Sequence, residues 1–314
     1  MEFLKKIHIT LDDYLTRIHE CYDGKHNYID YFIEPYGPML QNELSDTVYE
    51  DEGCSICYHE HSKGTETFLV DHGTVEVTSC GKRAYATEGD IIHTATFTPH
   101  AFNWMHAGTT QREMFQETLM NEDMMANARH RVHHPDTFDM MMNGKGNESV
   151  FHQYTPVTVE VEKEQLPLIR PYNGGIAQFQ FPGCLLRMKV GRWETKGLKE
   201  IWQLCMEPGF EIRCNEFNPY YSLYIVQEGS LDVRIDGMDR FVANQRDILH
   251  IPNHLAYELK AREPVVLFDF NCEGYLYRAM EEIYAVMVNE PERLNEAAEE
   301  ILRRNDFHIR GCQK

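Results

Sequence analysis

The sequence predicts a mainly β protein that consists of two β domains, an N-terminal helix and C-terminal helices. From residue 28 to 118, and again from 151 to 272, short runs of β-branched and aromatic residues alternate with Gly, Asp, Asn and Pro. Closely spaced runs of this kind are typical of antiparallel strands in a barrel or sandwich. The length of 314 residues favours two domains, and 42% hydrophobic and 25% charged residues are ordinary for a chain with a buried core.

The first expected element is a helix within residues 1–27. Thr10–Asp13 has the T-x-x-D pattern of a capping box, and Gly24 is placed to end the helix. Apolar residues recur at helical spacing through Leu11, Tyr14, Leu15, Ile18 and Cys21.

Residues 119–150 interrupt the strand pattern and are expected to connect the two β domains. They contain a Met-rich stretch and the run His130–His134. No carboxylate or cysteine stands near that run at the spacing of a metal site. We therefore interpret the run as a solvated or interface loop, with a lid over a barrel as the alternative.

Residues 273–314 are expected to form helices. Leu276, Met280, Ile283 and Met287 make one apolar stripe, and Pro291 suits the start of a second helix. The other face of these helices is acidic, which argues against DNA binding and favours a cover for the barrel or a dimer contact.

A group of potential metal ligands lies in the first β domain. His59 and His61 are two residues apart on a predicted strand, so both side chains point from one face. Glu66 opens the next strand, and an antiparallel neighbour can bring its carboxylate beside them. His100 adds a third imidazole after a further strand run. Three imidazoles and one carboxylate suit a divalent ion of Fe, Mn, Ni, Cu or Zn and leave coordination positions for substrate.

The spacing of these residues resembles the motifs of the cupin superfamily. The first motif, G-x5-H-x-H-x3-4-E-x6-G, is matched by Gly53, His59, His61, Glu66 and Gly73. The second, G-x5-P-x-G-x2-H-x3-N, is matched at Gly89 and His100, whereas its Pro, Gly and Asn are replaced by Ala95, Phe97 and Trp104. The resemblance implies a jelly-roll barrel in which His59, His61, Glu66 and His100 bind the metal.

The same template fits the second β domain without the ligands. Gly209 and Gly229 keep their separations from the ligand positions, which are occupied by Asn215, Phe217, Ser222 and Tyr257. This pattern resembles two-barrel cupins, or bicupins, in which one copy has lost its metal. We therefore expect one divalent metal per chain, with a substitute site at His250 and His254 as the weaker alternative.

Other histidines and cysteines receive lesser roles. Strand alternation places His106 on the inward face with His100, as a contact behind the ligands or a rim residue. It also places Cys57 inward with His59, while His72 and His93 receive no role. The nine cysteines are expected to be reduced. Cys54 and Cys57 have C-x-x-C spacing, and we interpret them as two buried small residues of a strand rather than as a zinc or redox site.

The charge of the chain limits its partners. Fifty acidic and thirty basic residues give a formal net charge of −20, which opposes binding to nucleic acid and to anionic lipid surfaces. No leader-like apolar segment or membrane-spanning stretch is found, so a cytoplasmic location and a small-molecule substrate are expected. A homodimer is the expected oligomer.

The expected function is that of a mononuclear Fe(II)-type dioxygenase acting on a small aromatic, enol or diketone substrate. This interpretation depends on an open metal centre near apolar side chains: Phe68, Phe97, Phe102 and Trp104. Glu66 would be a metal ligand or a base that takes the substrate proton. The alternatives are an oxygen-independent isomerase, decarboxylase or lyase acting on a small oxygenated acid or sugar, and a cupin that binds a ligand without catalysis.

Overall fold

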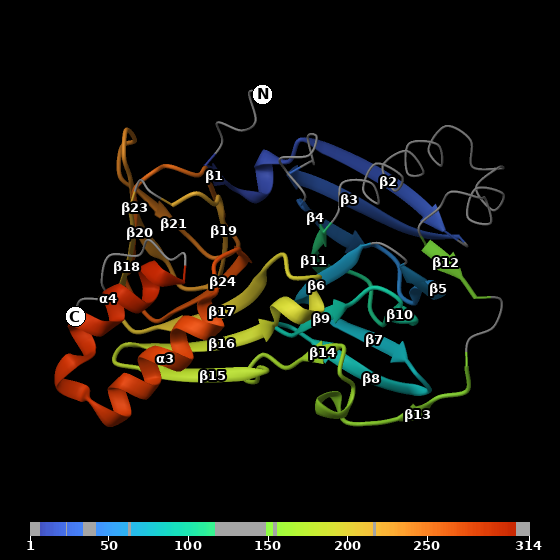
Figure 1. Ribbon diagram of the computed structural model, residues 1–314. Coiled ribbons are helices and arrows are strands. Elements are labelled where there is room, and N and C mark those ends of the chain that lie inside the picture. Colours follow the sequence, from blue (N-terminus) through green and yellow to red (C-terminus); the bar gives the residue numbers. More distant parts are fainter. Residues whose placement is uncertain are drawn as a thin grey trace. The chain divides into compact units, whose positions relative to one another are not determined.

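A computed structural model describes residues 7–22, 24–33, 42–61, 64–116, 149–152, 156–215 and 218–305 (Figure 1). The chain divides into two compact units, each built mainly of antiparallel strands. The N-terminal unit is Asp13–Gly174, and the C-terminal unit combines Met1–Asp12 with Gly175–Lys314. The mainly β fold predicted from the sequence is therefore confirmed.

Two sheets build the N-terminal unit. The first has the order β14 (Ile169–Arg170), β9 (Ile91–Thr94), β6 (Thr65–His72), β11 (Thr109–Gln116), β4 (Asn42–Tyr49), β3 (Lys25–Ile33) and β2 (Thr16–Tyr22). The second has the order β12 (Ser149–Phe151), β5 (Cys54–His61), β10 (His100–Trp104), β7 (Thr74–Ser79), β8 (Lys82–Thr87) and β13 (Val159–Glu160). Inward side chains of both sheets share one apolar core, which includes Phe68 of β6 and Phe102 of β10. The unit thus has the two-layer arrangement of a jelly roll.

The C-terminal unit repeats this plan. Its first sheet has the order β1 (His8–Ile9), β22 (Ile248–Ile251), β19 (Ser222–Glu228), β24 (Val265–Cys272), β17 (Glu200–Met206), β16 (Cys184–Val190) and β15 (Ala177–Phe181). Its second has the order β18 (Glu211–Cys214), β23 (Tyr257–Ala261), β20 (Leu231–Ile235) and β21 (Phe241–Ala243). Both sheets again contribute to one core.

The C-terminal helices are confirmed. Helix α3 (Leu276–Asn289) and helix α4 (Leu294–Arg304) are joined at Pro291, which begins a short 3-10 turn as a helix-starting proline does. Ile283 of α3 and Ile301 of α4 pack into the core of the C-terminal unit. Within the described part of the chain, no helix is long and apolar enough to cross a membrane.

The predicted N-terminal helix is wrong. Only Leu11–Asp13 form a single 3-10 turn, and Thr16–Tyr22 form strand β2 instead. Strand β2 pairs along its whole length with β3, and Gly24, at φ +74°, occupies the turn between them. The helical spacing of apolar residues was short, and strand pairing with burial of Ile18 against Tyr31 outweighs so weak a local preference.

The segments after the predicted connector differ from the expected plan. Strands β12, β13 and β14 pair with β5, β8 and β9 of the N-terminal unit, and that unit extends to Gly174 instead of ending near residue 118. Residues 157–162 lie in the second β region expected at residues 151–272, but they contribute only β13, which runs parallel to β8 of the N-terminal unit. Alternation alone could not reveal this, because it identifies strands but not their partners. His130–His134 and the methionines near residue 140 lie outside the described residues.

A buried ion pair joins two central strands of the N-terminal unit. Arg112 of β11 lies opposite Asp46 of β4, and its guanidinium makes two hydrogen bonds to the carboxylate, at 2.6 and 2.8 Å. Both residues are at most 3% exposed. A buried charge without its partner is costly, so the two residues depend on each other.

We expect Asp46→Asn to lower the free energy of unfolding by about 3–5 kcal/mol, because it removes the charge of the carboxylate that pairs with the buried Arg112 guanidinium. Urea denaturation of the full chain measures this. The exposed pair of Arg83 and Glu160, 3.1 Å apart, provides the control, since Glu160→Gln should cost at most about 1 kcal/mol. Equal effects of the two substitutions would show that the buried pair does not stabilise the sheet.

Candidate metal centre

Strand β5 carries two of the four predicted ligands. His59 and His61 project from the same face, and their exposed fractions are 2% and 3%. The strand is held on both sides, by β10 in antiparallel register with His100 opposite His59, and by β12 with Ser149 opposite His61. Because β5 is an interior strand of its sheet, the backbone that orients the two imidazoles is fixed by hydrogen bonds on both edges.

A β-bulge precedes His59. The register against β10 shifts between His59 and Ile56, so β5 holds one residue more than its partner at this point. The extra residue breaks strict alternation, and Cys57, predicted to face inward with His59, is instead exposed. Cys54 is buried, and neither cysteine forms a disulfide, so the expectation of two buried small residues holds only for Cys54.

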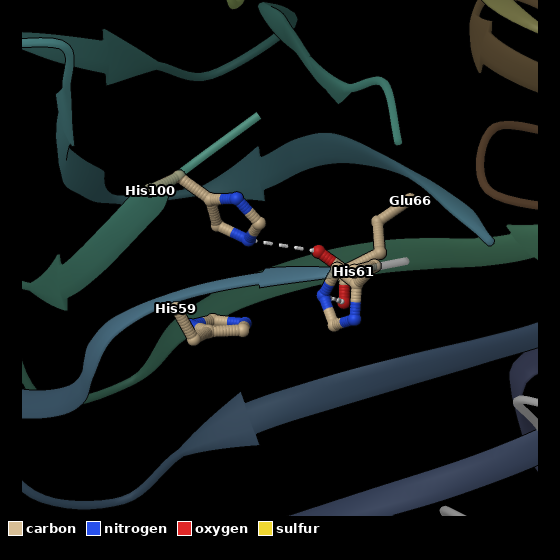
Figure 2. A group of neighbouring side chains, drawn as sticks. All are labelled: His59, His61, Glu66 and His100. Atoms are coloured by element: carbon tan, nitrogen blue, oxygen red, sulfur yellow. Dashed lines mark ion pairs between the residues drawn. The ribbon is translucent and has the colours of Figure 1, made fainter. Parts of the chain in front are cut away.

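Glu66 comes from the other sheet. It lies on β6, is 4% exposed, and pairs in register with Thr94 of β9. Its Oε1 is 2.8 Å from His61 Nε2, and its Oε2 is 3.2 Å from His100 Nε2 (Figure 2). The Thr94 hydroxyl also donates a hydrogen bond to Oε2, at 3.2 Å. The carboxylate therefore bridges two of the three imidazoles from across the barrel.

His100 begins strand β10 and is fully buried. The turn before it is fastened at several points: the Ser79 hydroxyl donates to the Pro99 carbonyl at 2.7 Å, and the Phe97 amide donates to the His61 carbonyl at 2.8 Å. Although the sequence of this turn departs from the cupin motif, it still delivers the histidine to the other three ligands.

The four side chains converge on one point (Figure 2). One potential ligand atom from each lies within 4.8 Å of the others, which makes this a group that could hold a metal ion. His59 Nδ1 donates to the Cys57 carbonyl at 2.8 Å, and His100 Nδ1 donates to the Thr98 carbonyl at 2.7 Å. A carbonyl can only accept, so in the neutral ring the proton is on Nδ1 and the lone pair is on Nε2. Such hydrogen bonds orient metal-binding histidines in proteins generally.

The ionisation states suit a metal cation. Burial, together with the nearby His100 ring, lowers the pKa of His59 to about 3, so its imidazole is neutral at pH 7. Burial alone would raise the pKa of Glu66, but the adjacent imidazoles of His61 and His100 outweigh burial and hold that pKa well below its usual range. A neutral imidazole and an ionised carboxylate are the forms that bind a divalent ion.

Aromatic side chains line one side of the group. The Phe102 ring lies 5.0 Å from His100 and 5.1 Å from Phe68, measured between centroids. Trp104 stacks on Tyr49 deeper in the same core, at 3.8 Å. Phe97 does not belong to this wall, contrary to expectation: it is 67% exposed and has a φ of +57°, because the turn before His100 directs it outward.

The other predicted candidates lie outside the centre. His106 and His72 are exposed, and His93 is buried with its Nδ1 at 2.9 Å from the Thr67 hydroxyl. Among the described residues, His59, His61, Glu66 and His100 are the one group of three or more potential ligands, so His250 and His254 form no substitute site there.

Two polar residues of the barrel interior were not identified from the sequence. Thr94 supports Glu66, and Glu113 of β11 lies opposite Phe68 in register and is 9% exposed. Alternation along β11 could have placed Glu113 inward, together with Gln111, which accepts a hydrogen bond from the Trp104 indole. No sequence signal distinguishes Thr94, because its role depends on which strand pairs with β6.

Comparison with protein-family models and with curated protein sequences finds no match to this chain. Solved structures do resemble it. The structure of Bacillus subtilis oxalate decarboxylase studied for its Mn(II) centres has a TM-score of 0.52 at 14% identity, and the match covers 98% of this chain and 89% of that one. The Lactobacillus farciminis oxalate decarboxylase formate complex has a TM-score of 0.52 at 13% identity, with 94% and 96% covered.

At this level of identity, the feature shared with the decarboxylases is the fold. Nearly the whole length of this chain and of each decarboxylase takes part in the match, including both compact units. The cupin fold predicted from the two motifs is confirmed.

Proposed function

We propose that this chain is a metal-dependent enzyme whose active site is formed by His59, His61, Glu66 and His100, with one divalent ion per chain. The observation that supports this most directly is the convergence of four ligand atoms within 4.8 Å, inside a barrel and behind aromatic side chains. The orientation of His59 and His100 by backbone carbonyls supports it further, because it directs both Nε2 lone pairs toward the shared point.

Manganese and iron are the leading candidates for the ion. Iron was favoured from the sequence, whereas the Mn(II) centres of the similar Bacillus subtilis decarboxylase favour manganese. The ligand set of three imidazoles and one carboxylate is also compatible with nickel, zinc and copper.

The favoured reaction is the oxygen-independent cleavage of a small oxygenated acid, as in a decarboxylase or other lyase. A divalent ion at this centre would act as a Lewis acid that holds and polarises a substrate oxygen. Backbone carbonyls hold the imidazoles of His59 and His100, and the low pKa of Glu66 suits a ligand better than a base. Phe68 and Phe102 exclude water from the reacting carbons. The fold shared with oxalate decarboxylases is the reason to prefer this class over the dioxygenase expected from the sequence.

The Fe(II)-type dioxygenase remains the second candidate because of one observation. The aromatic pair of Phe68 and Phe102 beside His100 would accommodate the ring or enol of an apolar substrate, which a small dicarboxylic acid does not need. Net uptake of dioxygen distinguishes the two reactions.

We also propose that the two units arose by duplication and that only the N-terminal copy binds metal. Both units contain the same turn: Asp90 accepts a hydrogen bond from the Thr87 amide, and Asp247 accepts one from the Asn244 amide, each at 2.8 Å. A small-molecule substrate, a homodimer and a cytoplasmic location complete this proposal.

Elemental analysis of the purified protein should find about one metal ion per chain. The double substitution His59→Ala and His61→Ala should abolish metal binding, because it removes half of the ligand set. His106→Ala, which alters an exposed histidine of the same unit, serves as the control and should retain the metal. Two ions per chain, or metal retained in the double variant, would contradict the proposed site.

The reaction class can be tested with oxalate and with a catechol, in air and without it. Metal-loaded protein should release carbon dioxide from oxalate without net uptake of dioxygen, and Glu66→Gln should lower kcat at least about a hundredfold, since a bridging carboxylate is replaced by a neutral amide. A dioxygen electrode and a carbon dioxide assay measure both. Oxygen uptake with the catechol and no turnover of oxalate would select the dioxygenase instead.

A further inference from the structure

Glu113 of β11 faces the interior of the N-terminal unit beside the candidate metal centre. In the pairing of β11 with β6, it lies opposite Phe68, which is two residues beyond Glu66 on the same face of β6. Glu113 is therefore a diagonal neighbour of Glu66 across the two strands. The Phe68 ring lies 5.1 Å from Phe102, which in turn lies 5.0 Å from His100. Glu113 thus belongs to the wall around the four ligands without being one of them.

The inward face of β11 is polar where it passes the centre. Gln111 accepts a hydrogen bond from the Trp104 indole at 2.8 Å, and its amide donates to the Tyr49 hydroxyl at 3.2 Å. Burial raises the pKa of Tyr49 well above its usual range, and the carboxylates of Glu113 and Glu66 contribute to that rise. Both carboxylates therefore act on the same part of the interior.

The charges of this interior limit what can bind there. Among the described residues of the N-terminal unit, Arg112 is the one buried arginine or lysine. It lies on the opposite face of β11 from Glu113, and its guanidinium is bound to Asp46. A divalent ion would be balanced by the carboxylates of Glu66 and Glu113. Two further negative charges on a ligand would be buried without compensation, so a ligand with at most one negative charge is favoured.

Glu113 is also the most open group of this wall. It is 9% exposed, against 4% for Glu66 and for Phe68 and 2% for Gln111. A carboxylate has about four positions that accept hydrogen bonds, so contacts within the wall leave it able to accept another.

We propose that Glu113 binds the substrate of the metal centre by accepting a hydrogen bond from it, and that the substrate is a small hydroxy acid. Its single carboxylate would serve the metal ion, and its hydroxyl group would donate to Glu113. This proposal rests on the proposed function, in which a divalent ion holds a substrate oxygen. A hydrogen bond to a carboxylate is roughly twice as strong as one between neutral groups, and a buried position strengthens it further.

Oxalate offers such a donor only as its monoanion, in which one carboxyl group keeps its proton. The affinity for oxalate should therefore fall as the pH rises above about 4, where carboxyl groups ordinarily ionise.

Isothermal titration calorimetry of the Mn(II)-loaded full chain with two acids tests the proposal. Glycolate has one carboxylate and a hydroxyl group, whereas methoxyacetate has a methyl ether in place of the hydroxyl and cannot donate. Glycolate should bind at least about tenfold more tightly, because a hydrogen bond to a charged acceptor is lost with methoxyacetate. Equal affinities, or binding of neither acid, would overturn the proposal.

Glu113→Leu replaces the acid by a side chain of similar size that cannot accept, and it should remove the preference for glycolate. Glu113→Gln should keep part of the preference, because the amide oxygen still accepts. The control is Glu60→Leu, on the outward face of β5 with His152 at 3.7 Å, which should leave the preference unchanged. A preference that persists in Glu113→Leu would have a steric cause and would contradict the role of Glu113.

Metal content separates this proposal from the proposed function. Both Glu113 variants should retain about one Mn(II) per chain, because Glu113 is outside the ligand group. Loss of Mn(II) in these variants would make Glu113 a ligand and overturn its role in substrate binding. Retained Mn(II) with equal affinities for the two acids contradicts the role of Glu113 alone, whereas a native chain that binds no Mn(II) contradicts the metal centre and both proposals with it.

Discussion

The register between β5 and β10 is the constraint on which the candidate metal centre depends. It places His59 opposite His100, and the bulge before His59 sets the face from which both β5 histidines project. Two contacts follow directly from this register: Cys57 and Thr98 present their carbonyls to the Nδ1 atoms of His59 and His100. The same backbone therefore fixes both the position and the tautomer of these two imidazoles, with each Nε2 lone pair left for a metal ion.

Comparison of the two units shows what the scaffold retains when ligands change. The left-handed glycines Gly73 and Gly229 occupy equivalent turns, with φ of +90° and +78°. A side chain at Gly229 would place its Cβ 2.3 Å from the Pro264 carbonyl oxygen, so glycine is required there by the backbone alone. Because these turns are set by the backbone, the residues that face the interior can change without altering the strands.

The sequence was sufficient for features that depend on local pattern and insufficient for those that depend on partners. Strands β5, β7, β16, β19 and β23, the C-terminal helices and the four converging ligands followed from alternation, helical periodicity and motif spacing. The helix expected near Leu11 does not form, because the pairing of β2 with β3 outweighs the local preference for a helix. Cys57 and Asn215 were misplaced by one bulge, since an extra residue in β5 changes both parity and the count from glycine to ligand.

The two interiors balance buried polarity in different ways. In the N-terminal unit, Glu66 is ionised between two imidazoles, and this concentrated charge is suited to a cation. In the C-terminal unit, Cys214, Ser222 and Tyr257 stand at the register positions of His59, Glu66 and His100, and burial raises the pKa of Asp269 to about 7. Neutral hydroxyl groups offer a divalent cation neither the negative charge nor the imidazole nitrogens that the N-terminal group offers. The two interiors therefore differ in the polar groups that they hold, while the carboxyl position opposite β6 or β19 remains the same.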